Sequence, residues 1–129
     1  MYKKQLKPVA KYRNEYNIIL NIDLPCTDIY ISDGLHKHIL KRHPDCISYI
    51  NRVDDILLNP DYIGENPKEK NSIEFVKCYS EIILVAVKLD IKDEYLYVAS
   101  VYDITDSKLQ RRIKSKRLIK TAVDKSDIL

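Results

Sequence analysis

Glycine is scarce in this chain of 129 residues, where Gly34 and Gly64 are the only two. The phosphate-binding loops of nucleotide-dependent enzymes need several closely spaced glycines, so the sequence contains neither a P-loop nor a dinucleotide-binding fingerprint. No apolar run approaches the roughly 20 residues that cross a bilayer, so we expect no membrane partner. With these binding motifs excluded, any catalysis would depend on polar side chains of the protein itself.

Cysteine and tryptophan are also poorly represented. The three cysteines are odd in number and lack Cys-x-x-Cys spacing, which argues against a disulfide framework and against a paired zinc site. We therefore predict a reduced, cytoplasmic protein that needs no cofactor and no metal. Tryptophan is absent and phenylalanine occurs once, whereas 10 tyrosines are present. So many tyrosines fit a protein interface as well as the stacking of nucleobases.

The net charge of +3 hides an uneven distribution. Residues 108–120 hold seven basic side chains and no acidic one, so the rest of the chain is net negative. Such asymmetry indicates a polyanionic partner, although a basic helix can also be a merely solvated face. We predict RNA contacts for five members of this segment: Lys108, Arg111, Arg112, Lys116 and Arg117.

Hydrophobic periodicity predicts an α+β fold, with an antiparallel sheet of about four strands, N-terminal helices packed on one face and a basic C-terminal helix. The run from Ile82 to Val87 is continuously apolar, which suits a central strand covered on both faces. A very short link should join it to the preceding strand as an antiparallel hairpin. The predicted strands cover residues 17–22, 28–32, 72–78, 80–89 and 95–104, with a very short extended piece at 62–63. The predicted helices cover 34–42, 46–57 and 106–120.

The domain organisation follows from the same pattern. Residues 1–27 should form an N-terminal arm, or a frayed short helix, followed by the first strand. Residues 28–120 should form the main globular domain, and residues 121–129 a loose tail. The length fits a single globular domain overall.

All three histidines, His36, His38 and His43, lie between Ser32 and Asp45. Histidine titrates near neutral pH, so this cluster is the natural place to look for proton transfer. One helix cannot aim all three at the same point, and whether His38 or His43 faces a cleft stays open. A metal site on the His-x-His pair would require a strand rather than a helix. A cysteine nucleophile is disfavoured because Cys46 falls on the apolar stripe of the predicted helix.

Cleavage of RNA without metal needs a base for the 2′-OH, an acid for the leaving oxygen and cations for the developing charge. Lys77 shares a strand face with Ile73 and Phe75 by period two, whereas Ser100 and Tyr102 interrupt a face expected to hold Leu96, Val98 and Ile104. Each candidate also has a non-catalytic interpretation. His43 could be a surface residue, Lys77 could protect an edge strand from aggregation, and Ser100 could be a hydrogen-bonded core serine. The predicted catalytic set consists of His43, Arg42, Lys77, Ser100, Tyr102 and His38.

Four short motifs carry a family resemblance: residues 38–44, 58–61, 75–77 and 98–102. Over about residues 28–118 the chain resembles the phage-associated nuclease-like domains, which are grouped with barnase, EndoU, the tRNA-cleaving colicins and RelE. The resemblance implies a compact metal-independent ribonuclease fold. It also implies that His43 with Arg42 matches a helix-end histidine motif, Lys77 a strand lysine, and Ser100 with Tyr102 a hydroxyl motif. Ser100 stands where threonine is common in the family.

Three hypotheses follow. The first is a metal-independent endoribonuclease of a phage or mobile element, resembling a toxin, with RNA as substrate and an inhibitor or immunity protein as a further partner. The second is a non-catalytic nucleic-acid-binding module, which would bind with steep salt dependence and without strand scission. The third is a phage accessory domain for protein interaction, which would neither bind nor cut RNA.

Overall fold

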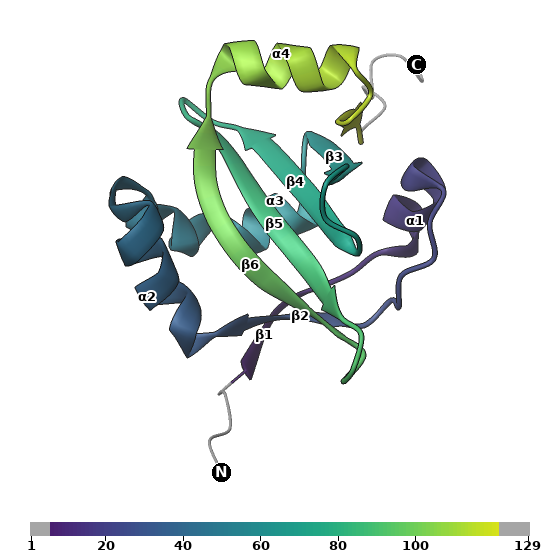
Figure 1. Ribbon diagram of the computed structural model, residues 1–129, viewed down its shortest axis with the longest axis vertical. Helices are drawn as coiled ribbons and strands as arrows, with labels where there is room; N and C mark the ends of the chain where they lie inside the picture. The colour runs from purple at the N-terminus through teal and green to yellow at the C-terminus, as the bar shows by residue number, and fades with distance from the viewer. Residues whose placement is uncertain (1–5, 122–129) are drawn as a thin grey trace.

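The computed structural model describes residues 6–121. Within this range the chain forms four α-helices, one 3₁₀-helix and seven strands, so the predicted α+β class is confirmed (Figure 1). The elements in chain order are β1 (Leu6–Lys11), α1 (Asn14–Leu20), β2 (Asp28–Ser32), α2 (Asp33–Arg42), η1 (Pro44–Arg52), α3 (Val53–Leu58), β3 (Tyr62–Glu65), β4 (Ser72–Cys78), β5 (Ile82–Asp90), β6 (Tyr95–Ile104), α4 (Asp106–Lys114) and β7 (Ile119–Lys120).

All seven described strands join one sheet in the order β1-β2-β6-β5-β4-β3-β7. Every neighbouring pair is antiparallel except β2 and β6, which run parallel. The expectation of about four antiparallel strands was therefore wrong, because the sheet is mixed and larger. The strands that the sequence pattern did not predict are β1 and β7, of 6 and 2 residues, whereas β3 extends the short piece predicted at residues 62–63 to Tyr62–Glu65. Pieces this short show little hydrophobic periodicity.

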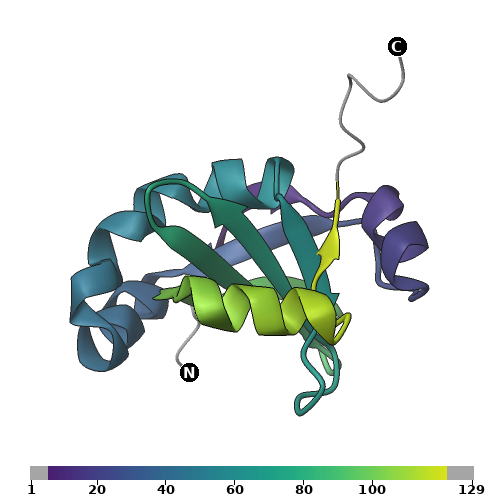
Figure 2. The same ribbon diagram turned by 90° about the horizontal axis from the view of Figure 1, so that it is seen from above.

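The sheet separates two apolar layers, with α3 and α4 on opposite sides (Figure 2). The central strand β5 serves both layers, as predicted: Ile83 and Val85 face the layer that contains α3, and Leu84 faces the layer that contains α4. Its antiparallel hairpin with β4 is also confirmed. Below, the side of the sheet that carries α4 is called the α4 face.

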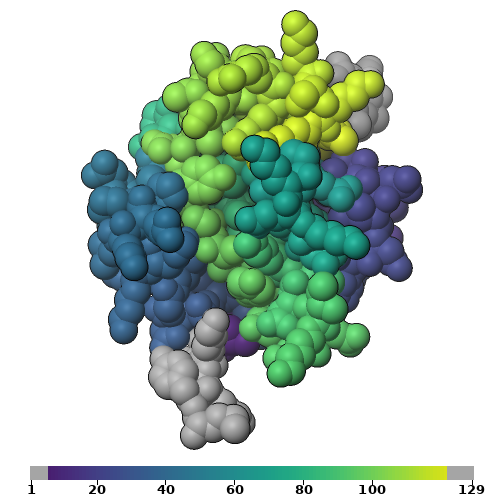
Figure 3. Space-filling view, viewed as in Figure 1, coloured from purple at the N-terminus to yellow at the C-terminus, as the bar shows by residue number. Residues whose placement is uncertain are grey.

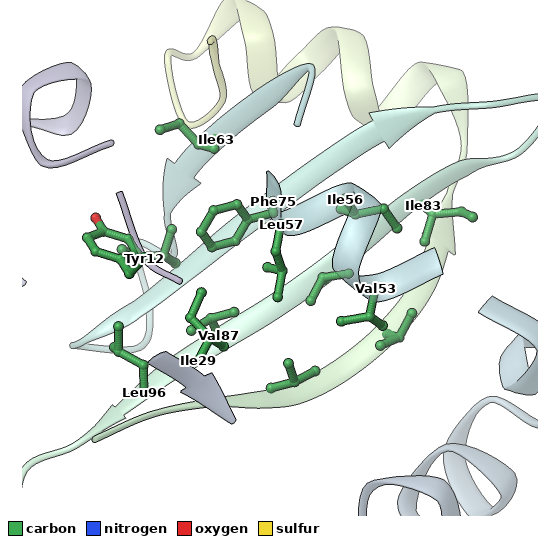
Figure 4. Packing of buried hydrophobic residues seen from close by; sticks show 14 of the residues in the cluster. Tyr12, Ile29, Val53, Ile56, Leu57, Ile63, Phe75, Ile83, Val87 and Leu96 are labelled. Atoms are coloured by element: carbon green, nitrogen blue, oxygen red, sulfur yellow. The ribbon is translucent and has the colours of Figure 1, made fainter. Parts of the chain in front are cut away.

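The larger core lies under α3, where Val53, Ile56 and Leu57 pack against Phe75 of β4 (Figure 4). The N-terminal segment contributes to the same core, because Tyr16 of α1 is 2% exposed and meets the Phe75 ring edge-on at 5.4 Å. The Tyr16 hydroxyl also donates a hydrogen bond of 2.9 Å to the Leu57 carbonyl. Residues before the predicted main domain thus help to hold α3 on the sheet.

The helices on the N-terminal side correct two predictions. The predicted strand over 17–22 is wrong, because residues Asn14–Leu20 form α1. The buried Asn17 side chain accepts a hydrogen bond from the Leu24 amide and donates one to the Leu24 carbonyl, so it fixes the loop after the helix instead of sitting in a sheet. The predicted helix over 46–57 divides into η1 and α3. Burial of Cys46 and Tyr49, three residues apart, suits the three-residue period of a 3₁₀-helix.

The basic C-terminal helix is shorter than predicted. The Thr105 hydroxyl caps α4 by accepting a hydrogen bond from the Lys108 amide, and the helix ends at Lys114. Lys116 then adopts a left-handed conformation with φ 66°, which no continuous α-helix allows. The chain turns back and adds β7 beside β3. The tail after Thr121 lies outside the described residues.

Candidate active site

A β-bulge in β6 decides which side chains meet on the α4 face. Val98 pairs with Val87 and Ser100 pairs with Ala86, so Ala99 is an extra residue on β6. An inserted residue reverses the alternation of side chains beyond it. Leu96 and Val98 consequently point into the α3 layer, whereas Ser100 lies on the α4 face with Ala86. The predicted face shared by Leu96, Val98, Ser100, Tyr102 and Ile104 was wrong for this reason.

The end of α2 brings His43 onto Tyr102 of β6. The two rings stack with their centroids 5.0 Å apart and their planes at 22°. His43 is the C-cap of α2, and its amide donates a hydrogen bond of 2.7 Å to the Ile39 carbonyl. Its own carbonyl accepts a hydrogen bond from the Cys46 amide of η1. The backbone of His43 is therefore held on both sides while its imidazole lies half-buried against the sheet.

A buried carboxylate, Glu74 of β4, lies on the same face. Glu74 is 1% exposed and pairs with Ala86, which in turn pairs with Ser100, so the three form one row across the sheet. Arg117 donates two hydrogen bonds to this carboxylate, at 2.8 Å from Nε and 2.9 Å from Nη2. Nη1 of Arg112 on α4 lies 3.7 Å from the same carboxylate. Two guanidinium groups thus share one buried negative charge.

Two polar atoms beside this cluster are buried and form no hydrogen bond within the described part of the chain. They are the Ser100 hydroxyl oxygen and Nη1 of Arg112. Buried polar groups nearly always have a partner, so the unpaired Ser100 hydroxyl marks a place where a ligand or a water molecule can complete the hydrogen bonding. Nη1 of Arg112 is the atom that lies 3.7 Å from the Glu74 carboxylate, so its positive charge is already paired although it donates no hydrogen bond.

The hydroxyl of Tyr102 lies among the same charges. Burial raises the pKa of Tyr102, and the negative charge of Glu74 adds to that rise, whereas the positive charges of Arg112 and Arg117 oppose it. Tyr102 is therefore protonated at neutral pH and can donate a hydrogen bond to a bound acceptor. Hydrogen bonding to the Glu74 carboxylate also raises the pKa of Arg117, which keeps this guanidinium charged.

Comparison with protein families gives one match over most of the chain. A model of the phage-Barnase-EndoU-ColicinE5/D-RelE like nuclease3 family, PBECR3, covers residues 7–111. The chain belongs to this PBECR3 family. A search of curated proteins finds no match, and neither does a search of solved structures.

The PBECR3 domain does not gather all of the predicted catalytic residues in one place. Lys77 lies on the opposite face of the sheet, where its ammonium donates a hydrogen bond of 2.7 Å to the Asn59 carbonyl. Arg42 is exposed at the end of α2. His38 lines a pocket with Tyr95 and Tyr97, apart from the stack that His43 forms. The residues brought together on the α4 face are His43, Tyr102 and Ser100.

The five predicted RNA-binding residues do share a surface. Lys108, Arg111, Arg112, Lys116 and Arg117 all line an open cavity of about 1390 Å³ between α4 and the loop that joins β3 to β4. Arg112 and Arg117 also contact Glu74, so this cavity, called the basic pocket below, adjoins the row of Glu74, Ala86 and Ser100.

Sequence reasoning missed Glu74 and the role of its two arginines. A usable signal was present: Glu74 sits between Ile73 and Phe75 in a strand with an apolar residue, Val76, on its own face. A charged residue at such a position must find a buried partner, and the basic segment after β6 was the available source. Among residues 6–121, no group of three or more His, Cys, Asp or Glu side chains could hold a metal ion. No helix in that range is long and apolar enough to span a bilayer.

Proposed function

We propose that this PBECR3 domain is a metal-independent endoribonuclease, with its scissile phosphate held on the α4 face beside His43. The observations that carry the proposal are the buried Ser100 hydroxyl, which has no hydrogen-bond partner among the described residues, and the stack of His43 on Tyr102 on the same face. A phosphodiester is an anion with acceptor oxygens, so it is a suitable acceptor for the Ser100 hydroxyl. The family supplies the nuclease class.

In the proposed mechanism His43 acts first as base and then as acid, and the other groups stabilise charge or hold their neighbours in place. His43 takes the proton of the 2′-OH as that oxygen attacks phosphorus, and then passes it to the departing 5′ oxygen. Ser100, Tyr102 and Arg112 donate hydrogen bonds to the non-bridging oxygens as negative charge grows there. The products are a 2′,3′-cyclic phosphate and a 5′-hydroxyl. Glu74 and Arg117 touch neither reacting oxygen and hold Arg112 in place. Lys77 has no role in this mechanism, because the sheet separates it from His43.

The test is cleavage of end-labelled total RNA by the purified protein in excess EDTA. Wild type should leave 2′,3′-cyclic phosphate ends, and His43→Ala should lower kcat/KM by about 10²- to 10⁴-fold, the usual contribution of a general base. His36→Ala is the matched control, because His36 lies on α2 and lines a different pocket with Leu6 and Lys7. Its activity should equal that of wild type.

A second substrate separates this mechanism from hydrolysis by water. RNA carrying 2′-O-methyl groups has the same charge and bases but no attacking hydroxyl, so it should not be cut. Cleavage of that RNA, or full activity in His43→Ala, would contradict the proposed mechanism. An inhibitor protein that blocks this face is a further expectation of the proposal, since a nuclease in the cytoplasm must be restrained.

A further inference from the structure

A second pocket lies on the same face, at the other end of β6. It has a volume of about 380 Å³ and is bounded by residues of β6, α2, β5 and β1. Tyr95 and Tyr97 form one wall, His38 comes from α2, and Lys88 comes from β5. We propose that this tyrosine pocket binds an unpaired nucleobase next to the scissile phosphate, so that the substrate is single-stranded RNA. The proposal rests on the proposed function for the identity of the phosphate site.

The aromatic rings provide a stacking surface. Tyr95 and Tyr97 have centroids 5.7 Å apart, and Tyr30 of β2 meets Tyr95 edge-on at 6.1 Å. Three rings that brace one another lose little conformational freedom when a base lies on them. Every base has an aromatic face, so stacking of this kind accepts any nucleotide that is not already paired.

The β-bulge places this surface in line with the phosphate site. Without the extra Ala99, residues 95 and 97 would lie on the opposite face from residues 100 and 102. With it, Tyr97 pairs with Lys88 and Ser100 pairs with Ala86, both on the α4 face. Lys88 and Ala86 are two residues apart on β5, a separation of about 7 Å. A base and a neighbouring phosphate in an extended single strand of RNA are separated by a distance of this size.

The rim of the tyrosine pocket is polar, with Asp33, His38 and Lys88 among its lining residues, so it suits a nucleotide better than an apolar ligand. His38 is exposed at the mouth of the pocket, and Lys88 lies opposite Tyr97 with its ammonium 2.7 Å from the Glu69 carboxylate. Figure 3 shows this side of the molecule, with the side chains of β6 at the surface between α2 and the segment that follows β3, and with α4 above them. A strand that enters over the tyrosine pocket can therefore continue past Ser100 toward α4.

The experiment measures binding of a short fluorescein-labelled oligoribonucleotide of mixed sequence by anisotropy. The protein carries His43→Ala, so that binding is observed with cleavage suppressed. Three probes of equal length are compared: the single strand, its blunt duplex, and an abasic strand with the same phosphates. If affinity depends on charge alone, the duplex should bind tightest and the abasic strand should bind as tightly as the normal single strand. Base capture predicts the opposite order, with the normal single strand bound tightest.

Variants locate the effect. Tyr97→Leu should weaken binding of the normal strand by about 5- to 150-fold, the range for loss of one base–aromatic stack, and should leave the abasic strand unaffected. Tyr97→Phe keeps the ring and should bind as wild type does. His38→Ala should weaken binding, whereas His36→Ala, on the same helix but lining a different pocket, should not. Circular dichroism and thermal unfolding of each variant confirm that the fold is intact.

The outcomes separate this proposal from the proposed function. Equal affinity for normal and abasic strands, or an equal loss in Tyr97→Phe and Tyr97→Leu, overturns the base pocket even if the protein cuts RNA. Binding that depends on bases and on the Tyr97 ring supports the pocket even if no cleavage is observed. In that case the catalytic proposal fails while the single-strand site stands.

Discussion

The imidazole of His43 lies against the ring of Tyr102 with the two centroids 5.0 Å apart. Tyr102 is anchored in the sheet by its pairing with Leu84, whereas His43 stands at the end of a helix. The strand therefore gives the histidine an orientation that the helix end alone would not impose. A stacked aromatic pair of this kind contributes about 0.5–1.5 kcal/mol beyond its buried area.

Substitutions at Tyr102 should separate the stack from the hydroxyl. Tyr102→Phe keeps the ring and removes one donor to the phosphate, so kcat should fall about 10- to 100-fold, the range for a hydrogen bond to a charged group. Tyr102→Leu also removes the ring on which the His43 imidazole stacks, so its kcat should fall further. Steady-state kinetics on RNA in EDTA measure both, and KM should change less than kcat. Equal activity in the two variants would mean that the stack does not orient His43.

The buried Glu74 should matter for stability as well as for the site. Glu74→Gln leaves two guanidinium groups beside a neutral amide, and loss of one partner from a buried ion pair costs about 3–5 kcal/mol. Glu69→Gln is the matched control, because Glu69 forms an exposed ion pair with Lys88 that is worth less than about 1 kcal/mol. Urea unfolding of the two variants compares the costs. Similar midpoints would show that Glu74 is not the anchor of this cluster.

The β-bulge marks the limit of what the sequence alone could reveal. Strict alternation along β6 correctly places Leu96 and Val98 on one face. It fails at Ala99, because the hydrophobic pattern contains no signal for an inserted residue. That one residue moves Ser100 and Tyr102 to the other face and away from Lys77. The predicted face of Lys77 is confirmed, since it shares that face with Ile73 and Phe75, whereas its catalytic role stays a prediction. The sequence identified Ser100, Tyr102 and Lys77 as candidates. Which of them lie on the same face of the sheet depends on the bulge.

Long-range pairing explains the other differences. The strong periodic segments, α2 and the hairpin of β4 and β5, were predictable because their own side chains decide their structure. The strand β7 has two residues, and it exists because β3 offers it a free edge. Residues 14–20 form a helix because Tyr16 is anchored to Leu57 and Asn17 to Leu24, contacts that a local apolar pattern does not reveal.

Gly64 should be intolerant of any side chain. Its Cα lies against the backbone carbonyl of Arg117, and an added Cβ would overlap that oxygen. Gly64→Ala should therefore force β3 away from the turn that carries Arg117, at a cost of about 1–3 kcal/mol or more. Thermal unfolding measures the loss. Gly34→Ala, in the first turn of α2 with its nearest neighbour 3.8 Å away, should be neutral or slightly stabilising. A tolerated Gly64→Ala would contradict the close packing of this turn.

Acid stability should depend on Asp55. Tyr79 donates a hydrogen bond of 2.5 Å to this carboxylate, and that bond is the main cause that lowers the pKa of Asp55 below its ordinary value of 3.8. A lowered folded-state pKa adds stability above pH 3.8 that is lost as the pH falls through the folded value. Tyr79→Phe should thus cost about 1 kcal/mol at pH 7, and the deficit should shrink below pH 4. Urea unfolding across this pH range tests it, with Tyr62→Phe as control. A deficit that stays constant with pH would exclude the linkage.

The basic pocket should govern the salt dependence of RNA binding. Lys108, Arg111 and Lys116 line it and are exposed, whereas Arg112 and Arg117 are held by Glu74. Each cation that releases a counterion from single-stranded RNA contributes about 0.7 to the slope of log K against log salt. Changing the three exposed cations to glutamine should therefore reduce the slope by about 2.

Two further lysines of the same segment provide the control for that measurement. Lys114 on α4 and Lys120 on β7 are exposed, and neither lines the basic pocket. If RNA follows the pocket, Lys114→Gln with Lys120→Gln should leave the slope nearly unchanged, although it removes charge from the same part of the chain. A change per residue equal to that of the pocket variant would mean that RNA responds to the general charge of the segment. The path past Glu74 and Ser100 toward α4 would then lose its support.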